Sequence, residues 1–179
     1  MIKEIRVLDK AFKELISEKE LSERIKVLAE KINSDYAGKE VVFLGILNGA
    51  FLFAADLFKH IDLKAKISFV KLASYEGTKS SGTIKELIGW NEDIKDKYII
   101  IIEDIVDTGN TLERIVDELV IRKAADIKVA TLLFKPEAYS KNIKLDYVGF
   151  EIPNEFVIGF GLDYDGYGRN FPSIYTLIN

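Results

Sequence analysis

The sequence of 179 residues contains no cysteine, one histidine, one tryptophan and three prolines. Without cysteine the chain forms neither disulfides nor thiolate metal sites, which fits a reducing compartment. No apolar run approaches the roughly 18 residues of a membrane span, and the first ten residues lack the apolar core of a signal peptide. With a net charge of −4 there is no basic excess for nucleic acid or an acidic membrane surface. We therefore expect a cytoplasmic protein with no nucleic-acid or membrane partner.

The chain does contain 48% apolar and 30% charged residues, the balance of a folded globular protein. At this length we expect one domain spanning residues 1–179. Apolar runs typical of buried strands alternate with segments of helical periodicity. We expect strands at 41–47, 67–72, 84–90, 98–102, 129–134, 147–150 and 156–158, and helices at 17–38, 50–58 and 112–125. The alternation predicts an α/β fold with a central, mostly parallel sheet flanked by helices.

The most informative stretch is residues 98–111, YIIIIEDIVDTGNT. Four consecutive isoleucines are typical of a parallel strand that is buried on both faces. We expect this strand to end at Glu103 and Asp104, which are followed by Asp107, by small polar residues and then by a helix. Ligands of open α/β sheets bind outside the carboxyl ends of the strands. This polar cluster is therefore the candidate functional site.

The turn at 107–111 has the composition of an anion site. Its backbone N–H groups and threonine hydroxyls, helped by a helix N-terminus, can face one phosphate. Two adjacent carboxylates would repel that phosphate unless a cation lies between them, and Mg²⁺ is commonly held by one or two carboxylates plus substrate oxygens. The pattern thus favours a Mg²⁺–phosphate substrate over a merely solvated strand end.

Two other motif interpretations are weaker. Aspartic proteases carry two Asp-Thr-Gly motifs in a β scaffold, whereas this chain has one, and it precedes a helix. A dinucleotide site would need a G-x-G-x-x-G motif after a strand, and none occurs.

Residues 103–111, EDIVDTGNT, resemble the phosphoribosyl-pyrophosphate (PRPP) signature of type I phosphoribosyltransferases. Further resemblances extend over about 41–177 and indicate the 6-oxopurine branch of that family. They are LNGA at 47–50 followed by FLFAADL (pyrophosphate loop), Ser74-Tyr75 (mobile-loop pair), LLFK at 132–135 (base-binding lysine), and DYVGFEIP at 146–153 with FVIGFGLDY at 156–164 (purine-binding hood).

The resemblance implies roles on the ribose side of the substrate. Glu103 and Asp104 would hold the ribose hydroxyls and Mg²⁺, and Asp107 would be the general base or acid for the proton on purine N7. The 5′-phosphate would be cradled by Thr108, Gly109, Asn110 and Thr111.

It also implies roles on the pyrophosphate and purine sides. Pyrophosphate would contact Asn48, Gly49 and Arg169, and Asp163 would bind a second Mg²⁺. Lys135 would donate to the purine 6-oxo group, Phe156 would stack on the ring, and the Val157 backbone would face the other edge of the base.

The activity implied by the resemblance is Mg²⁺-dependent purine salvage. The 5-phosphoribosyl group of PRPP would pass to N9 of hypoxanthine, and also of guanine, giving IMP or GMP and pyrophosphate. The hood would come from about residues 136–179 and the N-terminus, and the family suggests a homodimer or homotetramer. A nucleotide-sensing regulator built on the same fold is the alternative.

Several of these residues also have plain structural interpretations. Lys135 is then an ordinary surface lysine, Phe156 a core aromatic, and Arg169 a surface partner of Asp163 or Asp165. Position 48 is often basic in the family but is asparagine here, so pyrophosphate contact would rest on the backbone. The family further implies a cis peptide between residues 47 and 48.

Overall fold

The computed structural model of the chain describes residues 3–72, 86–88 and 93–178. In chain order the elements are β1 (Glu4–Val7), β2 (Lys10–Ile16), α1 (Glu18–Asp35), β3 (Glu40–Leu47), α2 (Phe51–Phe58), β4 (Lys64–Leu72), β5 (Glu86–Ile88), β6 (Tyr98–Val106), α3 (Asn110–Ile121), β7 (Asp126–Phe134), β8 (Tyr147–Glu151), β9 (Val157–Ile158) and β10 (Ile174–Leu177). Among these residues no helix combines the length and apolar character needed to cross a membrane.

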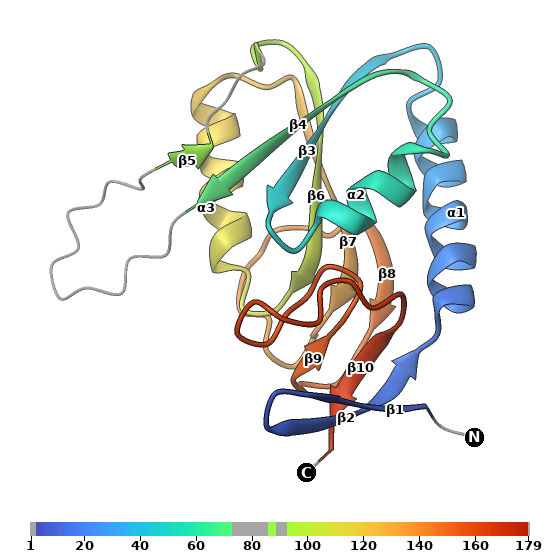
Figure 1. The fold of residues 1–179 in the computed structure, drawn as a ribbon. Helices are drawn as coiled ribbons and strands as arrows, with labels where there is room; N and C mark the ends of the chain where they lie inside the picture. Colours follow the sequence, from blue (N-terminus) through green and yellow to red (C-terminus); the bar gives the residue numbers. More distant parts are fainter. Residues whose placement is uncertain (1–2, 73–85, 89–92, 179) are drawn as a thin grey trace, which may run out of the picture.

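The main sheet has six strands in the order β5-β4-β3-β6-β7-β8 (Figure 1). Strands β4, β3, β6, β7 and β8 are parallel to their neighbours, and β5 pairs antiparallel with β4 at the edge. The order of the chain reverses between β3 and β6, so the loops that follow these strands diverge. A crevice at such a switch point is where α/β sheets bind ligands. The predicted mostly parallel α/β sheet is confirmed.

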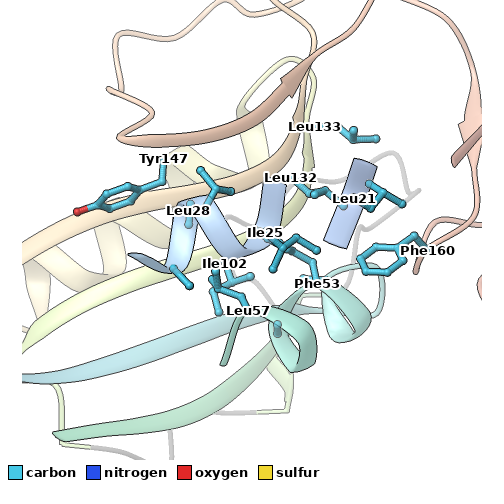
Figure 2. Close-up of a cluster of buried hydrophobic side chains, with 14 of the residues drawn as sticks. Leu21, Ile25, Leu28, Phe53, Leu57, Ile102, Leu132, Leu133, Tyr147 and Phe160 are labelled. Carbon is cyan, nitrogen blue, oxygen red and sulfur yellow. The ribbon is translucent and has the colours of Figure 1, made fainter. Parts of the chain in front are cut away.

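Helices cover both faces of this sheet. Ile100 and Ile102 of β6 pack into the core beneath α1 and α2, whereas Ile99 and Ile101 pack into the core beneath α3. Figure 2 shows side chains of α1 and α2 converging on Ile102. Each of the four isoleucines is fully buried, and each such burial contributes about 1.5–3 kcal/mol of transfer free energy. The run therefore anchors β6 in the centre of the molecule.

The long first helix begins as its sequence indicates. Ser17 is the N-cap, and its side chain forms a capping box with Glu20. The helix ends at Asp35, and the expected stop residue Gly38 follows with a φ of 76°. Its buried residues are Leu21, Ile25, Leu28, Ala29 and Ile32.

A second, smaller sheet joins both ends of the chain. Its antiparallel strands lie in the order β1-β2-β10-β9. Figure 1 shows it beyond the end toward which the β3 and β6 arrows point. Val7, Phe12, Ile158 and Tyr175 form its own small core. This sheet thus stands over the carboxyl edge of the main sheet.

The structure differs from the sequence prediction at several elements. β4 and β7 each begin three residues earlier than predicted. β6 does not end at Ile102 but continues through Glu103 and Asp104 to Val106. α3 runs from Asn110 to Ile121, shorter at its end than predicted. Residues 4–7, 10–16 and 174–177 are strands that no pattern predicted. Phe156 precedes β9 rather than belonging to it.

Candidate active site

Glu103 and Asp104 are buried at the end of β6, each 8% exposed. The Oε2 atom of Glu103 has no hydrogen-bond partner, while Oδ1 of Asp104 accepts a bond from the Ile105 N–H at 2.9 Å. Burial, with the adjacent Asp104 charge, raises the pKa of Glu103 well above its ordinary value. Burial also raises the pKa of Asp104, partly offset by hydrogen bonds and by the positive charge of Arg169. An unpaired buried carboxylate oxygen fits a cation or a hydroxyl donor.

The loop after β3 packs closely against Asp104. The peptide bond between Leu47 and Asn48 is cis, as the family resemblance implied. A Cβ added at Gly49 would overlap the Asp104 carboxylate, and one added at Gly161 would overlap the carbonyl oxygen of Gly49. Gly161 has a φ of 103°, which side-chain-bearing residues rarely adopt. Three segments distant in sequence therefore meet at Gly49, and only glycine fits there.

The turn after β6 forms a small cavity. The cavity has a volume of about 90 Å³. Its lining comprises Glu103, Ile105, Val106, Asp107, Thr108, Gly109, Asn110, Thr111 and Leu112. Gly109 caps α3 in the left-handed conformation, and no side chain caps the helix. The N-terminal end of α3 therefore lies at the cavity with first-turn N–H groups that an anion can satisfy.

Lys135 lies at the end of β7 beside this turn. The residue is only 8% exposed, and its Nζ lies 3.4 Å from Oδ2 of Asp107. The Asp107 side chain is about half exposed, at 47%. Lys135 is therefore not the ordinary surface lysine of the plain interpretation. A buried ammonium next to an accessible carboxylate can recognise a polar group and handle a proton in one place.

Arg169 and Asp163 form an ion pair in the C-terminal loop. Arg169 Nη2 lies 2.7 Å from Asp163 Oδ1, and Arg169 Nη1 donates to the Gly161 carbonyl at 2.6 Å. The other oxygen of Asp163 accepts from the Gly166 N–H at 2.7 Å. The pairing given as the plain alternative for Arg169 is thus present. It also ties Arg169 to the glycine that contacts Gly49.

Phe156 and Val157 belong to the second sheet. Val157 is buried in β9 opposite Thr176 of β10. Phe156 is 44% exposed and is not a core aromatic. Its ring centroid lies 6.3 Å from that of Phe12 and 6.0 Å from that of Tyr164. The ammonium of Lys10 lies 5.9 Å from the centroid of the same ring.

Two predicted residues, Ser74 and Tyr75, lie outside the described residues. Within the described part of the chain, no three carboxylate or histidine side chains gather into a metal cluster. Asp163 therefore does not join Glu103 and Asp104 in one such group. The oxygen donors of the buried pair still suit a hard cation such as Mg²⁺, which takes only one or two protein carboxylates.

A family model described as the phosphoribosyl transferase domain matches residues 13–165. The chain belongs to the phosphoribosyltransferase family. It is 47% identical to the hypoxanthine-guanine phosphoribosyltransferase of Lactococcus lactis over 172 residues, covering 95% of this chain and 93% of that protein. It is 41% identical to the enzyme of the same name from Aquifex aeolicus, covering 98% and 99%.

Solved structures agree with the sequence relatives. A crystal structure of a hypoxanthine-guanine phosphoribosyltransferase from Bacillus anthracis, with a HEPES molecule in its active site, matches with a TM-score of 0.86 and 38% identity. The match covers 98% of this chain and 99% of that one. The fold is thus that of the type I phosphoribosyltransferases, as the resemblance implied.

Some residues of the site were not found by sequence reasoning. Gly161 stands in a quoted motif, but nothing in the sequence shows that it contacts Gly49. Ser140 donates to the Thr108 carbonyl from both its backbone N–H and its hydroxyl, at 3.4 and 3.3 Å. Lys141 forms a 2.7 Å ion pair with Glu113. No local pattern signals these contacts, because they depend on how two loops pack.

We predict that Glu103→Gln stabilises the protein in the absence of ligands. A raised carboxyl pKa means that the folded state binds the proton more tightly, so ionised Glu103 reduces stability as the pH rises above the unfolded value of about 4.3. Glutamine removes this cost. We expect the unfolding temperature at pH 7.5 to rise by about 2–4 °C, which is about 1 kcal/mol for a chain of this size.

The control for this prediction is Glu30→Gln on the exposed side of α1, which should leave the unfolding temperature unchanged. The gain from Glu103→Gln should shrink as the pH falls toward 5. If Glu103→Gln unfolds at a lower temperature than wild type at every pH, ionised Glu103 does not destabilise the folded protein, and the prediction is wrong.

Proposed function

We propose that the chain is a purine salvage enzyme, a pentosyltransferase. It transfers the 5-phosphoribosyl group of PRPP to N9 of hypoxanthine, and of guanine, to give IMP or GMP and pyrophosphate. Family membership and relatives that carry this name over nearly their whole length support the activity. The observation that carries it is the ammonium of Lys135 beside Asp107, at the rim of the cavity of 103–112. A donor for a base, a proton acceptor and an anion site stand together there.

The ribose phosphate occupies the turn after β6. Thr108, Gly109, Asn110 and Thr111 bind the 5′-phosphate through their N–H groups and hydroxyls, aided by the positive end of the α3 dipole. Glu103 and Asp104 would hold the ribose hydroxyls and Mg²⁺. The unpaired Oε2 of Glu103 supports this assignment.

Pyrophosphate leaves on the side of the loop after β3. Asn48 and Gly49 present backbone groups to it, and the guanidinium of Arg169 suits its oxygens. Asp163, which pairs with Arg169, would hold a second Mg²⁺. Bound Mg²⁺ would neutralise the charge of the pyrophosphate leaving group.

The purine lies between the end of β7 and the second sheet, which serves as the hood. Lys135 donates to the 6-oxo group, Phe156 stacks on the ring and the Val157 backbone faces its other edge. A lysine has only donors, and adenine presents an amine where a 6-oxopurine presents an acceptor. Adenine would place its amine donor against the ammonium, which also has only donors, so it is rejected.

Asp107 handles the proton in the transfer step. The N9 lone pair forms the new bond to C1 of the ribose while the C1–O bond to pyrophosphate breaks. The purine then carries a positive charge, and its N7 proton passes to the Asp107 carboxylate. The Asp107 side chain is 47% exposed, so the purine can reach its carboxylate. General-base catalysis of this kind increases the rate by about 10²–10⁴-fold.

The finer properties belong to the same proposal. The enzyme depends on Mg²⁺, works in the cytoplasm and assembles as a homodimer or homotetramer from single-domain subunits. Ser74 and Tyr75, which lie outside the described residues, would shield PRPP from water. The regulatory alternative finds no support among the relatives, which are named as enzymes.

A steady-state assay with PRPP and each of hypoxanthine, guanine, xanthine and adenine tests the activity, run on wild type and on Lys135→Ala. We expect product from hypoxanthine and guanine and none from adenine. Lys135→Ala should raise the KM for hypoxanthine about 10–100-fold, the loss of one charged hydrogen bond, while the KM for PRPP changes less than about threefold.

Lys128→Ala, at the opposite end of the same strand, is the matched control and should behave as wild type. No product from any base would overturn the enzyme assignment. An equal loss of PRPP and purine binding in Lys135→Ala would overturn the role of Lys135.

Asp107→Asn should lower kcat by about 10²–10⁴-fold, because an amide cannot accept the N7 proton. The size of the side chain is retained, so PRPP affinity measured by calorimetry should stay within about threefold. Asp117→Asn, exposed on α3, controls for the loss of one negative charge. Full activity of the Asp107→Asn variant would show that another group takes the proton.

A further inference from the structure

The turn that lines the cavity has little internal support. Its Asn110 N–H reaches the Thr108 hydroxyl only at 3.5 Å, and α3 lacks a side-chain cap. Gly109 takes a φ of 84° at the start of the helix. A turn that binds a phosphate through backbone N–H groups must be held in shape before the ligand arrives. The contacts that surround the turn therefore decide its geometry.

The segment 139–143 packs directly on this turn. A Cβ added at Gly109 would lie 2.6 Å from the ring of Tyr139 and 2.8 Å from the Cγ of Lys141. The ring and the lysine stem thus cover the bare Cα of Gly109. The residues that line the cavity do not include Tyr139 or Lys141. The segment supports the turn without lining the cavity.

The supporting side chains are themselves fixed. The Tyr139 hydroxyl donates to the Ile143 carbonyl at 2.6 Å, and its ring lies edge-on to Phe134 with centroids 5.4 Å apart. Lys141 is paired with Glu113 of α3 at 2.7 Å. Ser140 donates twice to the Thr108 carbonyl. The two sides of the turn and the first turn of α3 are thereby tied to one segment.

The residues that lead into this segment begin at Lys135, on the purine side of the site. The Lys135 N–H donates to the Val106 carbonyl at 3.0 Å, and the Ala138 N–H closes a turn back to the Lys135 carbonyl at 3.2 Å. Only a few residues separate Lys135 from Tyr139. Displacement of the segment would therefore move the phosphate turn, whereas Lys135 stays anchored by β7.

We infer that residues 139–143 form a bracing segment that holds the 107–111 turn in its anion-binding shape, with Tyr139 as the main positioning residue. The inference rests on the proposed function in taking that turn as the 5′-phosphate site. A bracing role differs from a general structural one, because it predicts a selective loss of phosphate binding. Purine binding through Lys135 is preserved.

The test compares Tyr139→Ala with Tyr139→Phe in two measurements. Calorimetry with ribose 5-phosphate reports the turn without any catalysis, and steady-state kinetics report the KM for PRPP and for hypoxanthine. Tyr139→Ala should weaken ribose 5-phosphate and raise the KM for PRPP about tenfold, since small misplacements at such sites are costly. The KM for hypoxanthine should stay within about twofold. Tyr139→Phe keeps the ring over Gly109 and should recover most of the binding.

Leu145→Ala is the matched control, because Leu145 packs in the same hydrophobic cluster as Tyr139 but follows the bracing segment. It should lower the unfolding temperature without changing either KM. If Tyr139→Ala does not fold, Lys141→Ala replaces it, with an expected loss of about threefold.

Two results would separate the failures. If wild type makes no product from any base, the proposed function is wrong, and the ribose 5-phosphate titrations still decide the bracing role. If Tyr139→Ala binds ribose 5-phosphate as tightly as wild type, the bracing inference is overturned. It is also overturned if Tyr139→Ala raises the KM for hypoxanthine as much as the KM for PRPP, while Leu145→Ala changes neither.

Discussion

The carboxyl groups of Glu103 and Asp104 are carried into the interior by the strand that contains the isoleucine run. Four buried isoleucines fix β6 between two cores, so the two acids that follow have no freedom to turn outward. Their burial raises the pKa of both. Gly49 and Gly161 are required where they stand because the Asp104 carboxylate and the Gly49 carbonyl occupy the space of a side chain. The site is assembled around this pair.

Such a pair is a cost to the fold and an advantage to the chemistry. The buried, unpaired Oε2 of Glu103 lowers the stability of the protein without ligands. In the proposed function the same oxygen accepts from ribose hydroxyls or holds a hard cation, and its fixed position means that binding needs little reorganisation. The second sheet lies beyond the carboxyl ends of β3 and β6 (Figure 1). Under the proposed function, the buried carboxylates lower the stability of the ligand-free protein but are already in position for the substrate.

The sequence predicted those elements that are determined by residues close together in the chain. Uniform apolar runs marked β3, β6 and β7, and Ser17 with Glu20 marked the start of α1. The extension of β6 through Glu103 and Asp104 was not predictable from the neighbouring residues, because it depends on pairing with β7, where Glu103 lies opposite Thr131. The strand Lys10–Ile16 pairs with Ile174–Leu177, more than 150 residues away. Its sequence, KAFKELI, has no regular alternation of apolar and polar residues and does not indicate that partner.

The most direct test of the central claim is a calorimetric titration of wild-type protein with PRPP, in the presence of Mg²⁺ and again with Mg²⁺ removed by a chelator. In the proposed function the buried pair of Glu103 and Asp104 faces an anionic substrate, so binding should need a cation between the carboxylates and that substrate. We predict that removal of Mg²⁺ weakens PRPP binding by at least about tenfold, or 1.4 kcal/mol. Equal affinity with and without Mg²⁺ would contradict the account.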